Sequence, residues 1–523
     1  MSHETRSASR QIARATGVVM FGMVLSSITG LVTTMMVSNE FGTSAHLDAF
    51  YAANRLTELL FQIMAGGALA SAFLPTFTGF LTRGDREGAW RLASAITNLV
   101  LLTLTTLAIL AAIAAPWIVR NILAPGFTDP LQINLTVDLL RVMAISVVIF
   151  GLSGILMSIL NAHQHFLLPA LAPAAYRFGW ILGIFLLVPS MGIYGLAWGA
   201  VLGALFHLLI QLPGLLRLHA RYYRDLGLNN PAVHQVGRLM APRILGAAVV
   251  QINFLVNTIL ASAMIEGSLA AISFALALMI MPQAAIAQAA AIAALPTFSE
   301  QVARGDISQM RTSLVNTLRG VIFLALPASI GLILLRVPLV SMLLERGQFD
   351  IQSTEMVAWA LLWYAIGLMG HSVLEIVVRA FYALKDTWTP VLVGLIAMTL
   401  NIAFSLLFAS LFKRIGWLPL GGLALANSLA TAIESLVLVI LLRRRIHGLD
   451  VAKLLRWSII TIASAGAMVL ALLLWSIVMS EQPSWLVGLG GILVGASVYV
   501  VAALALGVPE PRSYLKMLME RVR

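Results

Sequence analysis

Long apolar runs separated by short polar segments account for almost the whole chain. A helix that spans the hydrocarbon core of a membrane needs about 20 predominantly apolar residues. Fourteen runs of about that length can be read between charged, proline or glycine breaks. They lie at residues 15–37, 47–76, 90–117, 134–160, 167–189, 193–215, 239–264, 268–295, 313–335, 354–382, 388–411, 420–442, 457–479 and 485–507. The pattern therefore predicts an all-α polytopic membrane protein with 14 transmembrane helices, and an even number places both termini on one side.

A motif of 12 residues occurs twice within this pattern. Residues 74–85 read LPTFTGFLTRGD and residues 295–306 read LPTFSEQVARGD, with seven identical positions at an offset of 221. Shorter matches pair NAHQHFLLP at 161–169 with YALKDTWTP at 382–390, and GLA at 195–197 with GLA at 422–424. Six predicted helices separate equivalent points, so the two copies share one orientation. We therefore predict two parallel six-helix repeats that form two lobes around a central cavity, plus two extra C-terminal helices.

The duplication also predicts how the chain is divided. The N-terminal lobe comprises residues 1–215 and the C-terminal lobe comprises residues 239–442. Residues 443–523 hold the last two predicted helices and a cytoplasmic tail. The linker at 216–238 contains LLRLHARYYRDLGLNN, in which apolar and basic residues mix, so we expect an amphipathic helix at the cytoplasmic membrane surface.

The distribution of lysine and arginine predicts the orientation. If the N-terminus is cytoplasmic, the cytoplasmic segments hold 22 of these residues and the outer loops hold 5. Basic residues concentrate on the cytoplasmic side of membrane proteins, so both termini are predicted to lie in the cytoplasm. The formal charge of +11 then reflects topology and contact with anionic lipid, and a nucleic-acid partner is not expected.

Composition narrows the class of protein further. The chain is 60% hydrophobic and 11% charged, whereas a soluble domain is about a quarter charged. The absence of cysteine excludes disulfides and thiolate metal sites. No phosphate-binding loop of the GxxxxGK[ST] type, no HExxH and no GxSxG occurs, so we expect no ATP hydrolysis by this chain. Two parallel bundles around a cavity are a transporter architecture, so we predict a transporter and not an enzyme. His163 and His165 are interpreted as polar loop residues and not as metal ligands.

Charged residues inside the predicted spans are the best candidates for function, because charge in a membrane is costly unless it is paired or faces a cavity. Arg55 and Glu58 lie three residues apart, and Glu375 and Arg379 lie four apart, so each pair shares a helix face. Each pair is either an internally neutralised ion pair or a cavity wall that contacts an anionic substrate or a coupling ion. The candidate cavity residues are Asp48, Arg55, Glu58, Arg177, Glu375 and Arg379.

Several motifs resemble those of a known family. They include LDAFYAANRL in the second predicted span, ILNAHQHFLLPALAP at 159–173 and, most specifically, RAFYALKDTWTP at 379–390. On these motifs the chain resembles the MurJ/MviN family, within the superfamily that also contains MATE exporters. The resemblance covers nearly the whole chain. It implies an alternating-access flippase that moves lipid II, the undecaprenyl-diphosphate-linked peptidoglycan precursor, from the inner to the outer leaflet for cell-wall synthesis.

The resemblance also implies that cavity arginines bind the diphosphate, since a guanidinium group fits phosphate oxygens. This chain departs from the family at several such positions, where it carries the neutral residues Ser27, Thr33, Phe61 and Ala277, and Glu375 in place of a lysine. Asp48, Arg55 and Arg379 remain. The chain is therefore either a lipid II flippase that uses the remaining arginines or a divergent paralogue that carries another polyprenyl-linked glycan or amphiphile. A non-transporting envelope scaffold is a third alternative.

The remaining expectations concern energy source and surroundings. We expect no cofactor, and a sodium or proton gradient or the membrane potential as the driving force. We expect a monomer in the bacterial inner membrane, in contact with membrane lipids, a lipid-linked substrate and cell-wall synthesis proteins.

Overall fold

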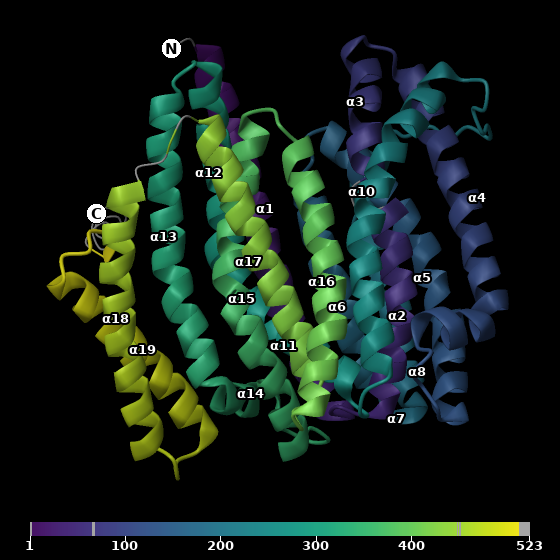
Figure 1. Ribbon diagram of the computed structural model, residues 1–523. Helices are drawn as coiled ribbons and strands as arrows, with labels where there is room; N and C mark the ends of the chain where they lie inside the picture. The colour runs from purple at the N-terminus through teal and green to yellow at the C-terminus, as the bar shows by residue number, and fades with distance from the viewer. Residues whose placement is uncertain (1–2, 65–67, 447, 449–450, 512–523) are drawn as a thin grey trace. The chain divides into compact units, whose positions relative to one another are not determined.

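Helices and short connections make up the computed structural model, which describes residues 3–64, 68–446, 448 and 451–511 and shows no strand among them (Figure 1). Twelve helical stretches within these residues are long and apolar enough to cross a membrane. The predicted all-α membrane fold is therefore confirmed. The chain divides into two compact units, Met1–Ala270 and Ala271–Arg523. The first unit ends one helix later than the lobe boundary that the duplication predicts.

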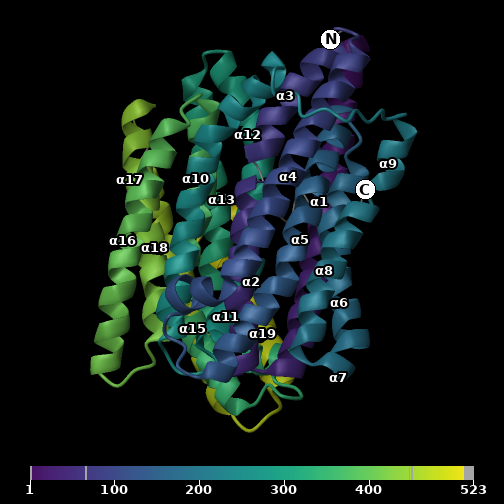
Figure 2. The same ribbon diagram turned by 90° about the vertical axis from the view of Figure 1, so that its right-hand side faces the viewer.

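The first unit is built around a long central helix. Its elements are α1 (His3–Phe41), α2 (Ala45–Met64), α3 (Ala68–Thr82), α4 (Arg86–Ile118), the π-helical turn η1 (Val119–Leu123), α5 (Pro130–Ala162), α6 (Leu167–Leu182), the π-helical turn η2 (Gly183–Leu187), α7 (Val188–Met191), α8 (Ile193–Leu209), α9 (Leu212–Arg217) and α10 (Pro231–Ser262). Helix α5 packs against α2, α4 and α8, and α6 packs against α1 and α8 (Figure 2). A methyl group on Gly179 would come within 2.2 Å of the Cα atom of Gly203, so glycines allow α6 and α8 to approach closely.

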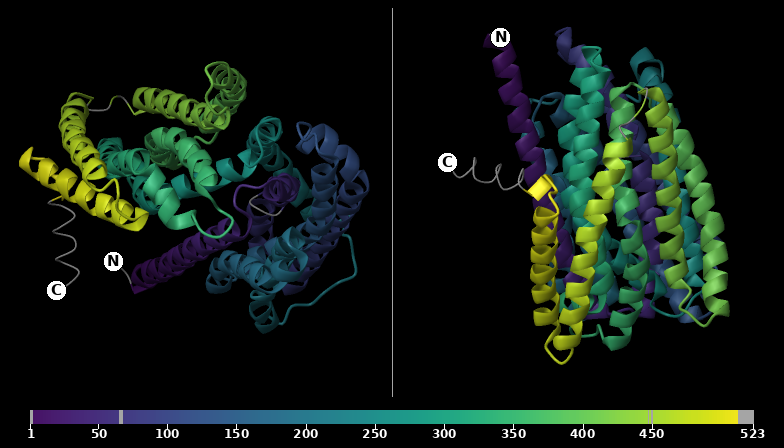
Figure 3. Two further views of the ribbon diagram at one scale, coloured as in Figure 1. Left: turned by 90° about the horizontal axis from the view of Figure 1, so that it is seen from below. Right: turned by 60° about the vertical axis from the view of Figure 1, so that its left-hand side comes forward.

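The second unit has two apolar cores. Its elements are most of α11 (Ser268–Gln283), the π-helical turn η3 (Ala284–Gln288), α12 (Ala289–Ala303), α13 (Ile307–Leu334), α14 (Arg336–Leu344), α15 (Ile351–Ala383), α16 (Trp388–Arg414), α17 (Leu420–Arg445), α18 (Val451–Val478) and α19 (Ser484–Ala505). One core forms where α15 packs against α12, α13 and α17 around Phe298 and Phe381. The other surrounds Phe323 and Tyr499, where the hairpin of α18 and α19 packs against α13 and α14 (Figure 3).

The predicted spans and the observed helices differ in two places. The second predicted span, 47–76, is divided between α2 and α3. Helix α2 carries three charged residues, Asp48, Arg55 and Glu58, and neither it nor α10 is among the twelve candidate spans. The end of the predicted cytoplasmic tail, 512–523, lies outside the described residues.

The two copies of the repeated motif form the same turn. Gly84 and Gly305 have φ angles of 75° and 74°, which glycine adopts without steric cost. The next residue caps the following helix, because Asp85 accepts a hydrogen bond from the amide of Gly88 and Asp306 accepts one from the amide of Gln309, both at 2.8 Å. The sequence identity between the motifs is therefore matched by identical local geometry.

A second pair of equivalent turns differs in its electrostatics. Gln164 and Lys385 occupy the same left-handed position, with φ angles of 61° and 60°. In the second unit the next residue, Asp386, pairs with Arg445 at 2.7 Å. The equivalent of Asp386 at the offset of 221 is His165, so the first unit has no carboxylate at this turn.

The predicted amphipathic helix over 216–238 is wrong. Helix α9 ends at Arg217, residues 220–226 have no regular structure, and α10 begins at Pro231 behind the cap residue Asn230. Side chains of α4 hold this connection in place of a helix: Ser94 accepts a hydrogen bond from the Tyr223 amide, and Asn98 donates to the carbonyl of Asp225. Gly227, with φ 58°, then turns the chain toward α10.

Replacing Asp306 should test the capping turn. We expect Asp306→Ala to lower the free energy of unfolding by about 1 kcal/mol, because the amide of Gln309 loses its acceptor. Asp306→Asn keeps an acceptor oxygen and should retain most of the stability. Thermal unfolding of the purified protein in detergent measures both, and equal stability of the alanine variant and the unaltered protein would contradict the capping role.

Asp386 should make stability depend on pH. Burial raises the pKa of Asp386, but hydrogen bonds from the amide and hydroxyl of Thr389 and the charge of Arg445 outweigh it and bring the pKa below its ordinary value. A carboxylate with a lowered pKa stabilises the fold at neutral pH, and this stabilisation is lost as the pH falls through that pKa. The melting temperature of Asp386→Asn should therefore fall less than that of the unaltered protein between about pH 6 and about pH 3.

Candidate functional site

Asp48 joins the start of α2 to the start of α11. Its buried carboxylate accepts hydrogen bonds from the backbone amides of Gly267 and Ala270, both at 2.8 Å. In return, Glu266 accepts a hydrogen bond from the amide of Ala45, at 2.8 Å. All of these residues belong to the first unit. Two helix N-termini at repeat-equivalent positions therefore cap each other, and both oxygens of Asp48 are engaged by backbone in this conformation.

Arg55 and Glu58 form the ion pair that their spacing predicts. The guanidinium Nη1 of Arg55 lies 2.8 Å from Oε2 of Glu58. Arg55 also donates from Nε to the hydroxyl of Thr258 at 3.2 Å, and its guanidinium carbon lies 5.2 Å from the centre of the Phe254 ring. Thr258 and Phe254 lie on α10, so this helix orients the pair. The side chain of Arg55 is 19% exposed and that of Glu58 is 44% exposed, so the carboxylate is the more accessible group.

Arg177 lies on α6 in an aromatic environment. Its guanidinium carbon is 5.8 Å from the centre of the Tyr176 ring and 5.7 Å from that of Trp180. Phe50 of α2 contacts the same aromatic group, because its ring centre is 5.3 Å from that of Trp180. No ion pair in the described part of the chain involves Arg177. Arg177 is therefore a cation among aromatic rings that also contact α2, with no carboxylate bound to it in the described part of the chain.

In the second unit, polar residues follow one face of α15. Glu375 and Arg379 lie 3.7 Å apart between Oε2 and Nη2, with side chains 26% and 31% exposed. One turn earlier, Nε2 of His371 is 3.1 Å from the side-chain oxygen of Asn427 on α17. His371, Glu375 and Arg379 follow a four-residue spacing and form a polar stripe along the C-terminal half of this helix.

The structure thus sorts the predicted site residues into groups. Arg55 and Glu58 pair in the first unit, and Glu375 and Arg379 pair in the second. Arg177 lies among aromatic rings of the first unit, and Asp48 contacts backbone. Sequence reasoning missed the aromatic residues around Arg177 and the contact between His371 and Asn427. The four-residue spacing of His371 from Glu375 was a signal that could have identified it.

Two histidines of the first unit, His163 and His207, contact neighbouring side chains within the fold. His163 stacks on Trp90, with ring centres 6.3 Å apart. His207 forms a buried network with Ser153 and Gln211, in which Nδ1 of His207 lies 2.6 Å from the Ser153 hydroxyl. Within the ranges that the structure describes, no group of three or more His, Asp or Glu side chains is arranged to hold a metal ion.

Comparison with known proteins identifies the family. The family model described as lipid II flippase MurJ matches residues 37–491. The lipid II flippase MurJ of Burkholderia cenocepacia is 30% identical over 431 residues, which cover 81% of this chain and 82% of that protein. The probable lipid II flippase MurJ of Vibrio cholerae serotype O1 is 30% identical over 519 residues, covering 94% and 96%.

The chain belongs to the lipid II flippase MurJ family. The resemblance to MurJ/MviN proteins is thereby confirmed, as is the prediction of a transporter in place of an enzyme. A solved structure of lipid II flippase MurJ in an inward closed conformation has a TM-score of 0.78 at 24% identity and covers 93% of this chain and 97% of that one. An inward-facing MATE family transporter of the MOP superfamily has a TM-score of 0.68 at 17% identity, covering 81% and 94%, and so shares the fold.

Three of the neutral residues of this MurJ family member, Phe61, Ser27 and Thr33, have contacts within the fold. The ring of Phe61 lies 4.5 Å from that of Phe150, which in turn contacts Tyr176. The hydroxyls of Ser27 and Thr33 donate to the carbonyls of Met23 and Thr29 in their own helix. Ser27 and Thr33 therefore hydrogen-bond to their own helix. Phe61 belongs to the aromatic packing that adjoins Arg177.

Asp48→Ala should destabilise the protein, because it leaves the buried amides of Gly267 and Ala270 without an acceptor. We expect the free energy of unfolding to fall by roughly 2–3 kcal/mol. Asp48→Asn keeps one acceptor oxygen and should lose about half as much. Chemical unfolding in detergent provides the measurement, and an alanine variant as stable as the unaltered protein would show that the reciprocal caps contribute nothing.

Proposed function

We propose that this protein is a lipid II flippase, which moves undecaprenyl-diphosphate-linked peptidoglycan precursor from the inner to the outer leaflet of the bacterial inner membrane. The observation that carries the proposal is the match of the lipid II flippase MurJ family model to residues 37–491. The physical need is plain, since a diphosphate and a sugar–peptide head group cannot cross hydrocarbon unaided. The substrate is lipid-linked, so its apolar tail can remain in the bilayer.

The proposed membrane arrangement extends the twelve candidate spans to fourteen. Helix α2 with α3, and helix α10, supply the two additional spans. The distribution of basic residues supports cytoplasmic termini. The identical turns at Gly84 and Gly305 support two parallel six-helix repeats, which alternate access to a central cavity by moving against each other.

Arg55, Arg177 and Arg379 are proposed to bind the diphosphate. They differ in whether a carboxylate must first be displaced from the arginine. Arg177 has aromatic neighbours and no ion pair among the described residues, so phosphate oxygens can approach it directly. Arg55 and Arg379 each have a carboxylate on the same helix, at 2.8 Å and 3.7 Å. The looser pair at Arg379 is the easier one to exchange for a phosphate contact. Glu58 and Glu375 would neutralise these arginines when the site holds no substrate.

The alternative cargo is another polyprenyl-linked glycan or a less anionic amphiphile. It is favoured by the four neutral residues at the positions where the family resemblance implies arginines. The aromatic packing of Phe61 is the specific structural observation, because it presents a ring where a second phosphate contact would otherwise be expected. Asp48 remains a proposed cavity residue in conformations that release its backbone contacts.

Coupling and partners complete the proposal. An ion gradient, of sodium or protons, or the membrane potential supplies the energy, and dissipating each gradient separately tests which one does. The protein is proposed to contact cell-wall synthesis proteins. It is proposed to function as a monomer.

Growth of a bacterium depleted of its own lipid II flippase tests the function. We expect the unaltered chain to restore growth. Arg177→Ala should reduce restoration most, because Arg177 has no ion pair among the described residues and can bind the diphosphate without displacing a carboxylate. Arg379→Ala should reduce it less. Arg141→Ala is a matched control, since Arg141 also lies in a span but is 48% exposed and pairs with Asp138.

The outcomes separate the alternatives. Failure of the unaltered chain to restore growth, despite normal membrane insertion, would favour the other cargo. Restoration by Arg55→Ala, Arg177→Ala and Arg379→Ala alike would remove the arginines from the proposed site. Restoration by a variant that no longer transports would favour a scaffold.

A further inference from the structure

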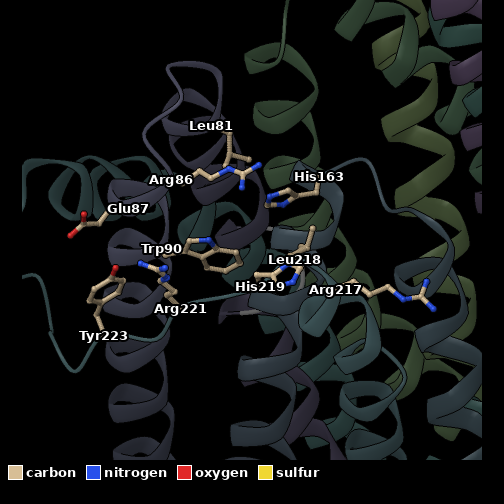
Figure 4. A pocket seen from close by; sticks show the side chains of 10 residues that line it. All are labelled: Leu81, Arg86, Glu87, Trp90, His163, Arg217, Leu218, His219, Arg221 and Tyr223. Carbon is tan, nitrogen blue, oxygen red and sulfur yellow. The ribbon is translucent and has the colours of Figure 1, made fainter.

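A pocket in the first unit lies apart from the proposed transport site. It has a volume of about 480 Å³ and forms where the start of α4 meets the turn after α5 and the connection after α9 (Figure 4). Its lining residues are Leu81, Arg86, Glu87, Trp90, His163, Arg217, Leu218, His219, Arg221 and Tyr223. All of these segments are cytoplasmic in the orientation that the basic residues predict.

The pocket carries an excess of positive charge. Three of its lining residues are arginines, and no ion pair among the described residues involves Arg86, Arg217 or Arg221. Its one carboxylate, Glu87, pairs at 2.8 Å with Arg91, which lies outside the lining. Figure 4 shows Arg86 and Arg221 on two sides of Trp90, with Arg217 at the edge. The guanidinium groups of Arg86 and Arg221 are therefore available to an anion, whereas the side chain of Arg217 extends away from Trp90.

The base of the pocket is rigid and aromatic. Trp90 is 8% exposed and stacks on His163, whose Nδ1 lies 2.9 Å from the carbonyl of Ile159. The connection that carries Arg221 is held to α4, because Ser94 accepts a hydrogen bond from the amide of Tyr223 and donates to the carbonyl of Arg221. Arg221 thus projects from a backbone that is held by partly buried polar contacts.

Apolar residues border the same pocket. Leu81, Leu218 and Trp90 line it, and the neighbouring Leu216 is 75% exposed. An exposed leucine beside tryptophan and arginine is typical of the membrane–water interface, where aromatic rings and basic groups meet lipid headgroups. A soluble anion would gain nothing from this apolar border, whereas the glycerol and acyl region of a lipid would cover it.

The second unit provides an internal comparison. At the offset of 221, Trp90 corresponds to Arg311, whose Nη2 donates to the carbonyl of Ile446 at 2.6 Å. His163 corresponds to Leu384, and the basic end of α17 is paired through Arg445 with Asp386. The equivalent corner is therefore neutralised by a carboxylate, and the first unit differs by keeping its arginines unpaired.

We propose that this pocket binds the phosphodiester headgroup of an anionic phospholipid, such as phosphatidylglycerol or cardiolipin, at the cytoplasmic surface. The phosphate is held by Arg86 and Arg221, with Arg217 at the rim, and the glycerol region lies against Trp90 and Leu218. The site is separate from the proposed transport function, because none of its residues belongs to the groups around Arg55 or Arg379.

Lipid binding to the purified full-length protein tests the proposal. Native mass spectrometry from detergent, titrated with phosphatidylglycerol and separately with phosphatidylcholine, measures the affinity of each. Arg86→Gln/Arg221→Gln should weaken phosphatidylglycerol binding by roughly thirtyfold, since each basic residue near a membrane surface contributes about a fivefold change. Phosphatidylcholine, which has no net charge, should bind weakly to both proteins.

A matched control lies three residues from each changed position. Arg83 and Arg224 are exposed residues of the same two segments and do not line the pocket. Arg83→Gln/Arg224→Gln removes the same charge and should change phosphatidylglycerol affinity less than twofold, because neither of these arginines lines the pocket that holds the phosphate. Melting temperatures without lipid verify folding, and if the double variant fails to fold, Arg221→Gln alone should still lose roughly fivefold.

Three results would overturn the proposal. The first is equal phosphatidylglycerol affinity for the pocket variant and the unaltered protein. The second is an equal loss in the control variant, which would show non-specific attraction to charge. The third is thermal stabilisation by inorganic phosphate, abolished in the pocket variant, without stabilisation by phosphatidylglycerol, which would assign the arginines to a soluble phosphate.

Discussion

The rest of this structure depends on the cost of leaving a polar group unpaired in hydrocarbon. Backbone amides at helix ends have no partner within their own helix, and lipid offers none. The chain meets this requirement with short side chains at the places where helices start. Asp85 and Asp306 cap the helices that follow the repeated motif, and Asp48 and Glu266 cap across from one helix start to another. These contacts set where α2, α4, α11 and α13 begin.

The same constraint explains the arrangement of charge in the candidate site. Arg55 and Arg379 carry carboxylates on their own helices, which reduces the cost of holding a cation within the membrane. Arg177 is stabilised by aromatic faces and not by a carboxylate. Under the proposed function, a diphosphate would approach Arg177 directly and would compete with a carboxylate at Arg55 and Arg379. That graded accessibility suits a carrier, which has to release its substrate as well as bind it.

Duplication followed by divergence accounts for the contrast between the two units. The turns at Gly84 and Gly305 and at Gln164 and Lys385 have the same backbone geometry. Their side chains have diverged, because backbone geometry constrains only the glycine and capping positions. At the corner where Asp386 pairs with Arg445 in the second unit, the first unit has histidine and three arginines that form no ion pair among the described residues. A shared fold thus supports two surfaces with different electrostatics.

The sequence by itself determined the membrane class, the helical fold, the duplication, the ion pairs and the family. Each of these follows from local properties: apolar length, spacing along a helix, and motifs at a constant offset. It did not determine the structure of residues 216–238, where composition suggested a helix but hydrogen bonds from Ser94 and Asn98 stabilise an irregular connection. Only the tertiary structure showed that Asp48 caps distant backbone amides and that Arg86 and Arg221 share a pocket with Trp90. The physical reason is that such contacts join residues far apart in the chain, and no periodicity within a single helix records them.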